Sequence, residues 1–377
     1  MSMEAYMKAA ITEACLAMGR THPNPAVGAV IVHDGEVAAR GHTQAAGGNH
    51  AEIEALQAFH SKGLQSGAGT TLVVTLEPCS TTGRTGACTE AIIASGIRRV
   101  VVGAVDPNPV HAGRGLDVLR EAGIEVTAGL LERECTDLNL IFNWRMTSNS
   151  TFMAGKVATT IDGRIATRGG LSKWITGPEA RADVHRWRRY FPAIAVGAGT
   201  VLADDPSLTA RVEGEEIWCP VRFVFDRNLI TFKESAYQVY TDQWKDRTIV
   251  VTSSNQEDKV RALEDAHGIR FFLAGDEIDE SGLEGFCRFC EAEGIGGVFI
   301  EGGASLISSF IKYRKLHYLY AYRGPRILAD TSGLSPFMGQ EPFSMQDAIA
   351  LRDVRHATFE DDQLMRGFIV YPESANR

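Results

Sequence analysis

Three side chains of the kind that bind transition metals lie at short, ordered intervals in the first quarter of the chain. His50 opens the segment His50-Ala51-Glu52, Cys79 follows a proline, and Cys88 comes nine positions later. One imidazole and two thiolates suit Zn²⁺, and three protein ligands leave a fourth position for water, as in catalytic zinc sites. Zinc lowers the pKa of such a water toward neutrality. Glu52 is then placed to shuttle protons as a general acid and base without binding the metal.

The order of these residues is typical of zinc deaminases that act on cytosine or adenine, whose pattern is H-x-E followed by P-C-x-x-C. The first half and Pro78-Cys79 match, but eight residues separate Cys79 from Cys88. We expect the inserted segment 80–87 to form a loop over the substrate. Taken singly, a His-x-Glu on a helix is most often a solvated face, and two cysteines are most often apolar filler. Their conjunction favours the zinc site.

The sequence around these residues predicts alternating helices and strands. Helical spacing is present at 4–19 and 50–62, and weaker helical patterns at 87–96 and 115–122. Strands are expected at 27–32, 37–40, 71–76, 99–104 and 125–128, with Asp34-Gly35 as a hairpin turn between the first two. This alternation indicates a layered α/β domain.

The segment 146–151 is polar and turn-rich, so we place a domain boundary there and expect domains at 1–147 and 148–377. Beyond it the pattern restarts. Strands are expected at 152–158, 193–196, 222–225, 248–252 and 297–300, and helices at 178–189, 256–265, 281–293 and 304–313. The second half is therefore a second α/β domain.

The composition is that of a globular, reduced protein. With 38 basic and 47 acidic residues the net charge is −9, which argues against non-specific binding to nucleic acid or to an anionic membrane. No run approaches about 18 apolar residues, and Glu4 and Lys8 interrupt the N-terminus, so neither a membrane span nor a signal peptide is expected. Seven cysteines in so long a chain are no disulfide scaffold. We expect a cytoplasmic protein.

Further short motifs run in order across both halves. They are His22-Pro23-Asn24-Pro25-Ala26-Val27-Gly28, Glu77-Pro78-Cys79, Gly83-Arg84-Thr85, Asp106-Pro107-Asn108-Pro109, Asp162-Gly163-Arg164, Ser172-Lys173-Trp174-Ile175-Thr176, Thr200-Val201-Leu202-Ala203-Asp204-Asp205-Pro206 and Glu301-Gly302-Gly303. With them the chain resembles the bifunctional riboflavin-biosynthesis deaminase/reductase family. The resemblance implies an α/β architecture with an N-terminal cytidine-deaminase-like three-layer domain and a C-terminal dihydrofolate-reductase-like domain.

The same resemblance implies two consecutive reactions on a small phosphorylated pyrimidine. The first domain would remove the 2-amino group of 2,5-diamino-6-(5-phosphoribosylamino)pyrimidin-4(3H)-one by hydrolysis, with zinc. The second would reduce the ribosyl side chain to ribityl with NADPH, giving 5-amino-6-(5-phosphoribitylamino)uracil. The expected partners are this substrate and a second copy of the chain, with no nucleic acid and no membrane.

For the first domain, the resemblance implies substrate contacts on several loops. Asn24, Asp106 and Asn108 would hydrogen-bond the pyrimidine and ribose, and Arg84 would bind the phosphate as a fixed cation. His42 would lie near the pocket, although a histidine that only orders a loop is an equal alternative.

The inserted loop departs from the family pattern. Thr81 and Thr82 stand where a histidine is usual, and Gly86-Ala87 where two prolines are usual. These departures concern the loop contacts and leave the zinc ligands intact.

For the second domain, the resemblance implies adjoining substrate and cofactor sites. The implied substrate contacts are Ser172, Arg188, Leu208, Arg211 and Glu301. We also expect Lys156, in the strand that enters this domain, to approach the substrate. The implied cofactor contacts are Ala158, Trp174, Thr200, Asp204, Gly303, Ala304, Ser305, Leu306, Ile307, Ser308 and Ser309. Arg188 and Arg211 suit a phosphate, and Asp204 and Glu301 suit the orientation of sugar hydroxyls or the relay of a proton. Because no G-x-G-x-x-G occurs in the right context, a Rossmann domain is not expected.

Two other readings of the whole chain stay open at this point. A nucleic-acid base deaminase with a C-terminal RNA-binding module could use the same zinc set, but the charge of −9 disfavours it. A degenerate deaminase kept for assembly is disfavoured because all three ligands and Glu52 are present.

Two further features concern single positions of the second domain. Arg227 could pair with the 2′-phosphate of the cofactor. Cys287 and Cys290 form a C-x-x-C that we interpret as ordinary helix packing.

Overall fold

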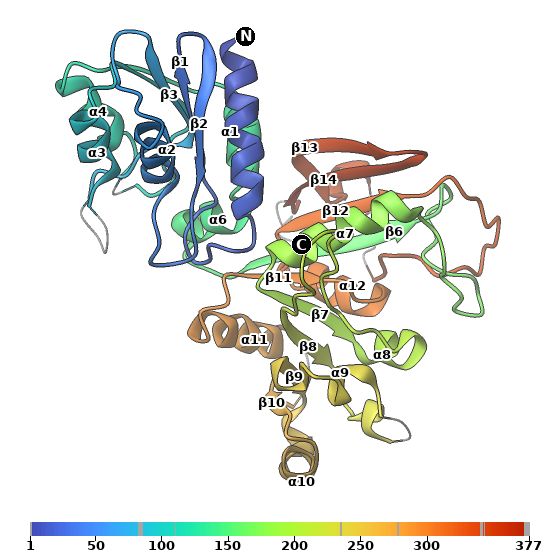
Figure 1. The fold of residues 1–377 in the computed structure, drawn as a ribbon. Helices are drawn as coiled ribbons and strands as arrows, with labels where there is room; N and C mark the ends of the chain where they lie inside the picture. The colour runs from blue at the N-terminus through green and yellow to red at the C-terminus, as the bar shows by residue number, and fades with distance from the viewer. Residues whose placement is uncertain are drawn as a thin grey trace. The chain divides into compact units, whose positions relative to one another are not determined.

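The computed structural model describes residues 2–81, 86–109, 111–233, 236–276, 279–339, 342 and 344–372. The chain divides into two compact units, Met1–Ser150 and Thr151–Arg377, each of which is described by itself (Figure 1). The division follows helix α6 (Leu140–Ser148), so the first part of the segment 146–151 is helical and not a turn. Among the described residues, no helix has the length and apolar character needed to cross a bilayer.

A five-stranded sheet forms the centre of the first unit, in the order β2-β1-β3-β4-β5. Its strands are β1 (Gly28–His33), β2 (Glu36–His42), β3 (Thr70–Leu76), β4 (Arg99–Ala104) and β5 (Glu125–Ala128). β1 pairs antiparallel with β2 and β3, whereas β3, β4 and β5 run parallel. Asp34 and Gly35 have φ values of 49° and 83°, the positive values of a type I′ turn, which confirms the predicted hairpin.

Helices cover both faces of this sheet. They are α1 (Met3–Ala17), α2 (Ala51–His60), α3 (Cys88–Ala94), α4 (Arg114–Glu121), α5 (Glu132–Asp137) and α6. Gly28 and Gly41 lie on opposite faces of the β1–β2 pair, and a Cβ there would overlap the backbone of α1 and of α2 respectively. The two glycines thus let a helix lie directly on each face. This arrangement confirms the predicted three-layer domain (Figure 1).

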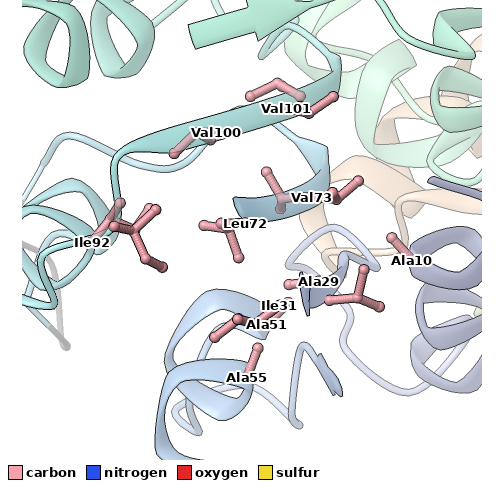
Figure 2. Close-up of a cluster of buried hydrophobic side chains, with 14 of the residues drawn as sticks. Ala10, Ala29, Ile31, Ala51, Ala55, Leu72, Val73, Ile92, Val100 and Val101 are labelled. Carbon is pink, nitrogen blue, oxygen red and sulfur yellow. The ribbon is translucent and has the colours of Figure 1, made fainter. Parts of the chain in front are cut away.

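Buried apolar side chains fill the space between the sheet and its helices (Figure 2). On the α2 face, residues from three neighbouring strands meet small residues of α2 and one residue of α3; they are Ile31, Leu72, Val100, Ala51, Ala55 and Ile92. All six are fully buried. Because protein cores are close-packed and resist deformation, this layer seats the first turns of α2 and α3 firmly beside the ends of the strands.

A nine-stranded sheet forms the second unit, in the order β10-β9-β8-β7-β11-β6-β12-β14-β13. The strands are β6 (Phe152–Thr159), β7 (Ala193–Gly197), β8 (Val221–Phe225), β9 (Thr248–Thr252), β10 (Arg270–Leu273), β11 (Gly297–Ile300), β12 (Tyr318–Arg323), β13 (Ala350–Phe359) and β14 (Asp362–Val370). All pairings from β10 to β12 are parallel, and β14 pairs antiparallel with both β12 and β13.

Two apolar clusters lie on the two faces of this sheet. One contains Ala195 and Phe223 and packs against α11 (Glu280–Ala292) and α12 (Ala304–Lys312). The other contains Ile194 and Val224 and packs against α8 (Ala198–Asp204), α9 (Gln238–Thr241) and α10 (Glu257–His267). Helix α7 (Pro178–Tyr190) precedes β7. The second α/β domain is therefore confirmed, with four strands, β10, β12, β13 and β14, that the sequence pattern did not predict.

Candidate functional site

The local structure brings the four residues of the H-x-E and P-C motifs to one place. His50 is the extended residue that precedes the first turn of α2, and Glu52 lies in that turn with 4% of its surface exposed. Cys79 follows β3 after Pro78, and Cys88 is the first residue of α3. The ligands therefore come from two helix N-termini and one strand end, all held by the core of the first unit.

The three predicted ligand atoms converge. His50 Nδ1 lies 3.2 Å from Cys88 Sγ and 3.6 Å from Cys79 Sγ, and the backbone N–H of Cys88 donates to Cys79 Sγ over 3.4 Å. All three ligand atoms lie within 4.8 Å of one another. Among the residues that the structure describes, this cluster has no fourth histidine, cysteine or carboxylate. A three-ligand cluster of this kind is suited to a zinc ion with an open position.

The ionisation of the two thiols supports the same fit. A hydrogen bond with the Cys88 thiol, assisted by His50, lowers the pKa of Cys79 to about 4. The same hydrogen bond and then burial raise the pKa of Cys88 far above its ordinary value. The opposite directions of the two pKa shifts reflect the one hydrogen bond that the two sulfur atoms share. A dication at this position would stabilise both thiolates at once, since a coordinating thiol is deprotonated by its metal.

Glu52 has the properties of a proton carrier. Burial raises its pKa from 4.5 to about 7, and the thiolate of Cys79 adds to the rise. A carboxyl group whose pKa lies near the working pH can both release and accept a proton during turnover. Its environment is therefore suited to general acid–base work beside the metal ligands.

Metal content provides a direct check of the ligand set. We expect about one zinc ion per chain in the wild type, less than a tenth of that in Cys79→Ala and Cys88→Ala, and full content in Glu52→Gln. The measurement is bound metal per chain after dialysis against a weak chelator. Cys15→Ala is the matched control because Cys15 is an exposed free cysteine of α1. Zinc content at the wild-type level in Cys79→Ala and Cys88→Ala would contradict the ligand assignment.

Among the other candidate residues of the first unit, Asp106 lies near the metal-ligand cluster. Asp106 follows β4, and its carboxylate accepts the backbone N–H of Asn108 over 2.8 Å. Burial raises the pKa of Asp106, and the charges of Glu77 and Cys79 add to the rise, which places Asp106 near the cysteine ligand. Glu77 belongs to the motif Glu77-Pro78-Cys79, but the sequence analysis assigned it no role in the site.

His42 and Asn24 are tied to local structure. His42 Nδ1 lies 3.5 Å from a carboxylate oxygen of Glu13 on α1, which is what the loop-ordering alternative expects. Asn24 takes part in a turn in which its N–H donates to the carbonyl of Thr21. Arg84 and Thr82 lie outside the described residues, so the phosphate contact on the inserted loop stays a prediction.

In the second unit, three charged residues, one just after β11, one within β6 and one on α7, form one buried cluster. Arg188 Nε donates to Glu301 Oε1 over 2.5 Å and its Nη2 to Oε2 over 3.0 Å, a bidentate pair. Lys156 Nζ lies 3.7 Å from the same carboxylate. Glu301 directly follows β11, and Lys156 lies on the neighbouring β6. Ligands of parallel sheets bind at such strand ends.

The pKa shifts in this cluster follow from its charges. Burial would raise the pKa of Glu301, but Arg188 and Lys156 outweigh it and lower the pKa to about 2. Burial and the neighbouring Arg188 lower the pKa of Lys156 in spite of Glu301. Glu301 is therefore a fixed anion, and Lys156 is the more readily deprotonated member.

The two arginines predicted to bind phosphate differ. Arg188 is already engaged by Glu301 and by the carbonyl of Thr209. Arg211 is more accessible, and its Nη1 contacts the hydroxyl of Ser207 at 2.9 Å. His185, which sequence reasoning missed, accepts the backbone N–H of Arg211, and burial followed by the charges of Arg188 and Arg211 lowers its pKa to about 4.

Several predicted contacts of the second unit lie at the surface. Trp174 is 59% exposed, and the Arg181 guanidinium lies 4.4 Å above its ring. Asp204, at the end of α8, pairs with Lys173 at 3.0 Å. Thr200 is in the first turn of α8, and Ser172 is half-buried in the segment that carries Trp174.

Other predicted contacts have side chains that face the core. Leu208 is buried in the cluster beneath α8, and Leu306 and Ile307 are buried under α12. Ser308 Oγ accepts the backbone N–H of Met338 over 2.8 Å. Only the backbone of these residues is in a position to meet a ligand. The exposed part of the Gly303–Ser309 stretch is at its start, Gly303 and Ser305, with Ala304 and Ser309 partly buried.

The remaining sequence features have structural explanations or stay untested. Ala158 of β6 pairs with Tyr322 of β12. Cys290 is fully buried in the core of the second unit and Cys287 packs beside it, in line with helix packing. The backbone carbonyl of Arg227 accepts two hydroxyl hydrogen bonds, and its proposed contact with a 2′-phosphate remains a prediction.

Comparisons with known proteins agree with this two-part architecture. The family described as "RibD C-terminal domain" matches residues 152–365, and the "Cytidine and deoxycytidylate deaminase zinc-binding region" matches residues 1–104. The riboflavin biosynthesis proteins RibD of Actinobacillus pleuropneumoniae and Escherichia coli are each 36% identical, over 97% and 94% of this chain and 95% and 97% of their own lengths.

Solved structures give the same result for the fold. A diaminohydroxyphosphoribosylaminopyrimidine deaminase/5-amino-6-(5-phosphoribosylamino)uracil reductase from Thermotoga maritima is 34% identical, with a TM-score of 0.78 over 98% of both chains. RibD from Acinetobacter baumannii is 31% identical, with a TM-score of 0.75 over 97% of this chain and 98% of its own. These likenesses favour the two-step enzyme over the nucleic-acid base deaminase. The chain belongs to the RibD family of riboflavin-biosynthesis proteins, with a deaminase domain followed by a reductase domain.

Proposed function

We propose that this chain catalyses two consecutive steps on one phosphorylated pyrimidine. The first is hydrolytic loss of the 2-amino group of 2,5-diamino-6-(5-phosphoribosylamino)pyrimidin-4(3H)-one, and the second is NADPH-dependent reduction of the ribosyl side chain to ribityl. The observation that carries the proposal is the convergence of His50, Cys79 and Cys88 within 4.8 Å beside the buried Glu52. The Thermotoga relative, named for both activities, supports the choice of substrate.

Zinc held by His50, Cys79 and Cys88 supplies a Lewis-acidic centre and a water of lowered pKa. Glu52 accepts a proton at its carboxylate as the water attacks the carbon that bears the amino group. Glu52 would deliver that proton to a ring nitrogen, and would then carry a second proton, from the newly added hydroxyl group, to the departing ammonia. A pKa of about 7 lets the one carboxyl group of Glu52 both accept and donate a proton.

The pyrimidine is held by polar groups on loops around the cluster. Asp106 and Asn108, which follow β4, hydrogen-bond the base and ribose, and Asn24 binds from the loop before β1. His42 lies beside this pocket. Arg84 binds the phosphate, because a guanidinium offers paired donors to phosphate oxygens.

In the reductase domain NADPH supplies the hydride. Glu301, held by Arg188, accepts hydrogen bonds from sugar hydroxyls and stays charged throughout. Lys156, whose pKa is lowered by burial, donates a proton to the sugar oxygen that is released as the hydride adds to carbon. Asp204 serves as the second acidic group that orients the sugar.

The binding contacts of this domain divide between the two ligands. Ser172, Arg211 and the backbone of Leu208 hold the substrate. The cofactor lies against Ala158, Trp174 and Thr200. Its pyrophosphate accepts hydrogen bonds from backbone N–H groups at the start of α12, at Gly303, Ala304 and Ser305. We further propose that the enzyme works in the cytoplasm as a homo-oligomer, without a nucleic-acid or membrane partner.

Arg211 provides the test of the phosphate site. We expect Arg211→Ala to weaken substrate binding about 10- to 100-fold, since a charge-assisted hydrogen bond contributes about 1.5–3 kcal/mol, and to change NADPH binding less than about twofold. Separate titrations of each ligand measure this. Arg261→Ala is the control, because Arg261 is exposed on α10 and pairs with the exposed Glu257 four residues before it. Equal weakening of substrate and NADPH would contradict the assignment.

The decisive experiment for the whole proposal uses the diaminopyrimidine phosphate with and without NADPH. We expect stoichiometric ammonia release without NADPH, and a product reduced by two hydrogens only when NADPH is added. Ammonia and product mass are the two readouts. Inertness toward this substrate combined with deamination of tRNA would instead support the nucleic-acid base deaminase.

A further inference from the structure

Glu77 is the last residue before Pro78-Cys79 and is 6% exposed. Its carboxylate accepts three backbone N–H groups from one later segment of the chain. Oε2 accepts from Asp106 over 3.1 Å and from Gly113 over 2.9 Å, and Oε1 accepts from Gly115 over 2.8 Å. A buried carboxylate is costly unless its oxygens are satisfied, and here both are.

These bonds join two parts of the deaminase site that are distant in sequence. One part is the strand end that carries the ligand Cys79. The other begins with Asp106 and Asn108 and ends at the start of α4, between 29 and 38 residues from Glu77. The Asp106 carboxylate in turn accepts the N–H of Asn108. Beyond the backbone pairing of β3 with β4, which ends at Leu76 and Ala104, the Glu77 side chain thus links the segment of both candidate substrate residues to Cys79.

Packing at Gly115 supports the same connection. A Cβ at Gly115 would overlap the carbonyl oxygen of Pro78 and would come within 3.1 Å of Glu77 Oε1. The start of α4 therefore lies directly on the Pro78-Cys79 peptide. Gly113, one of the three donors, has a φ of 80°, which lets the chain turn so that its N–H points at the carboxylate.

From this arrangement we propose that Glu77 is a positioning residue of the deaminase site. Its carboxylate holds the residues that bind the pyrimidine at a fixed distance from the metal ligands, without touching metal or substrate itself. The inference rests on the proposed function, because it assigns Asp106 and Asn108 to the substrate. It adds a residue whose role is to align two halves of one site, and alignment errors of about 1 Å can cost about 100-fold in activity.

Two variants disturb the contact in different ways. Glu77→Gln keeps the shape of the side chain but turns an NH₂ group toward backbone N–H donors, so at least one of the three loses its acceptor. Gly115→Ala keeps the carboxylate and pushes α4 away from Pro78. We expect both to raise the KM for the diaminopyrimidine phosphate about tenfold or more, with kcat within about threefold, because lost binding contacts act on KM when the chemistry is intact.

Readouts besides activity are measured on the same zinc-loaded full chains. We expect bound zinc to stay at the wild-type level. We expect amide hydrogen exchange to speed up at least about tenfold at one or more of Asp106, Gly113 and Gly115, because hydrogen bonds to the Glu77 side chain are lost or lengthened. Leu119→Ala is the matched control. Leu119 is a fully buried apolar residue of the same helix, α4. Its truncation should lower the melting temperature without removing a hydrogen bond to Glu77.

The outcomes separate the inference from the proposed function. A wild-type enzyme that releases no ammonia overturns the proposed function and the inference with it. An active wild type in which Glu77→Gln and Gly115→Ala change the KM no more than Leu119→Ala does overturns the positioning role alone. Loss of zinc from both variants also overturns it, since the carboxylate would then support the metal ligands and not the substrate residues.

Discussion

Replacing Glu52 with glutamine should abolish ammonia release while the chain keeps its zinc. The amide cannot carry a proton, and Glu52 is the buried carboxyl beside Cys79 and Cys88 whose pKa lies at about 7. General acid–base catalysis contributes about 10²–10⁴-fold. Because one group serves both proton transfers, we expect a loss in kcat at the upper end of that range. Ammonia release at saturating substrate and zinc content per chain measure the two parts of the prediction.

The two domains allow an internal control for this variant. NADPH oxidation on pre-deaminated substrate should be unchanged in Glu52→Gln, because the reductase residues belong to the other unit. Glu54→Gln is the matched variant: Glu54 lies in the same first turn of α2, where it accepts a hydrogen bond from Asn49 Nδ2 over 2.8 Å. Joint loss of both activities, or an equal loss in Glu54→Gln, would show that the division of labour is wrong.

Several strands that carry buried apolar runs could be predicted from the sequence, whereas the charged strands β13 and β14 could not. Strands such as β4 and β9 are short apolar stretches bounded by polar residues, and their predicted ranges, 99–104 and 248–252, match the structure. β13 and β14 instead contain charged residues along much of their length, among them Arg352, Asp353 and Arg366. The pairing of β14 with β12 is a tertiary contact, which no local pattern of apolar residues reveals.

The same distinction explains what could be predicted of the site. A metal ligand needs a particular side-chain type, so His50, Cys79 and Cys88 can be recognised in the sequence by residue type and spacing. Glu77 acts on backbone N–H groups, which every residue but proline carries, so nothing in the distant segment marks its partners.

Packing limits the prediction in the second domain as well. The engagement of Arg188 by Glu301 depends on α7 lying across the end of β11, which the sequence does not state. Leu208 matches a family contact in the sequence, yet its side chain is part of the core.

Glu301→Gln should destabilise the reductase domain by about 3 kcal/mol at pH 7. The charges of Arg188 and Lys156 overcome the effect of burial and lower the pKa of Glu301 from 4.5 to about 2, and each pKa unit corresponds to about 1.4 kcal/mol. Glutamine cannot neutralise the two cations, which then remain buried without their common partner. Denaturant unfolding followed by tryptophan fluorescence measures the change. Four of the five tryptophans lie in this domain, and a Trp144→Phe background removes the fifth.

The pH dependence of this difference follows from the direction of the shift. Because the folded-state pKa is lowered, the stabilisation is complete above about pH 5 and is lost as the pH falls through the interval from 4.5 to about 2. At pH 3 less than half of it should remain, about 1 kcal/mol. Glu293→Gln is the comparison, since the Glu293–Arg270 pair is exposed at 2.9 Å and such pairs contribute about 1 kcal/mol or less. If the Glu301 and Glu293 variants lose equal stability at pH 7, or if the Glu301 difference persists undiminished at pH 3, the carboxylate is not the charge that holds Arg188 and Lys156 in place.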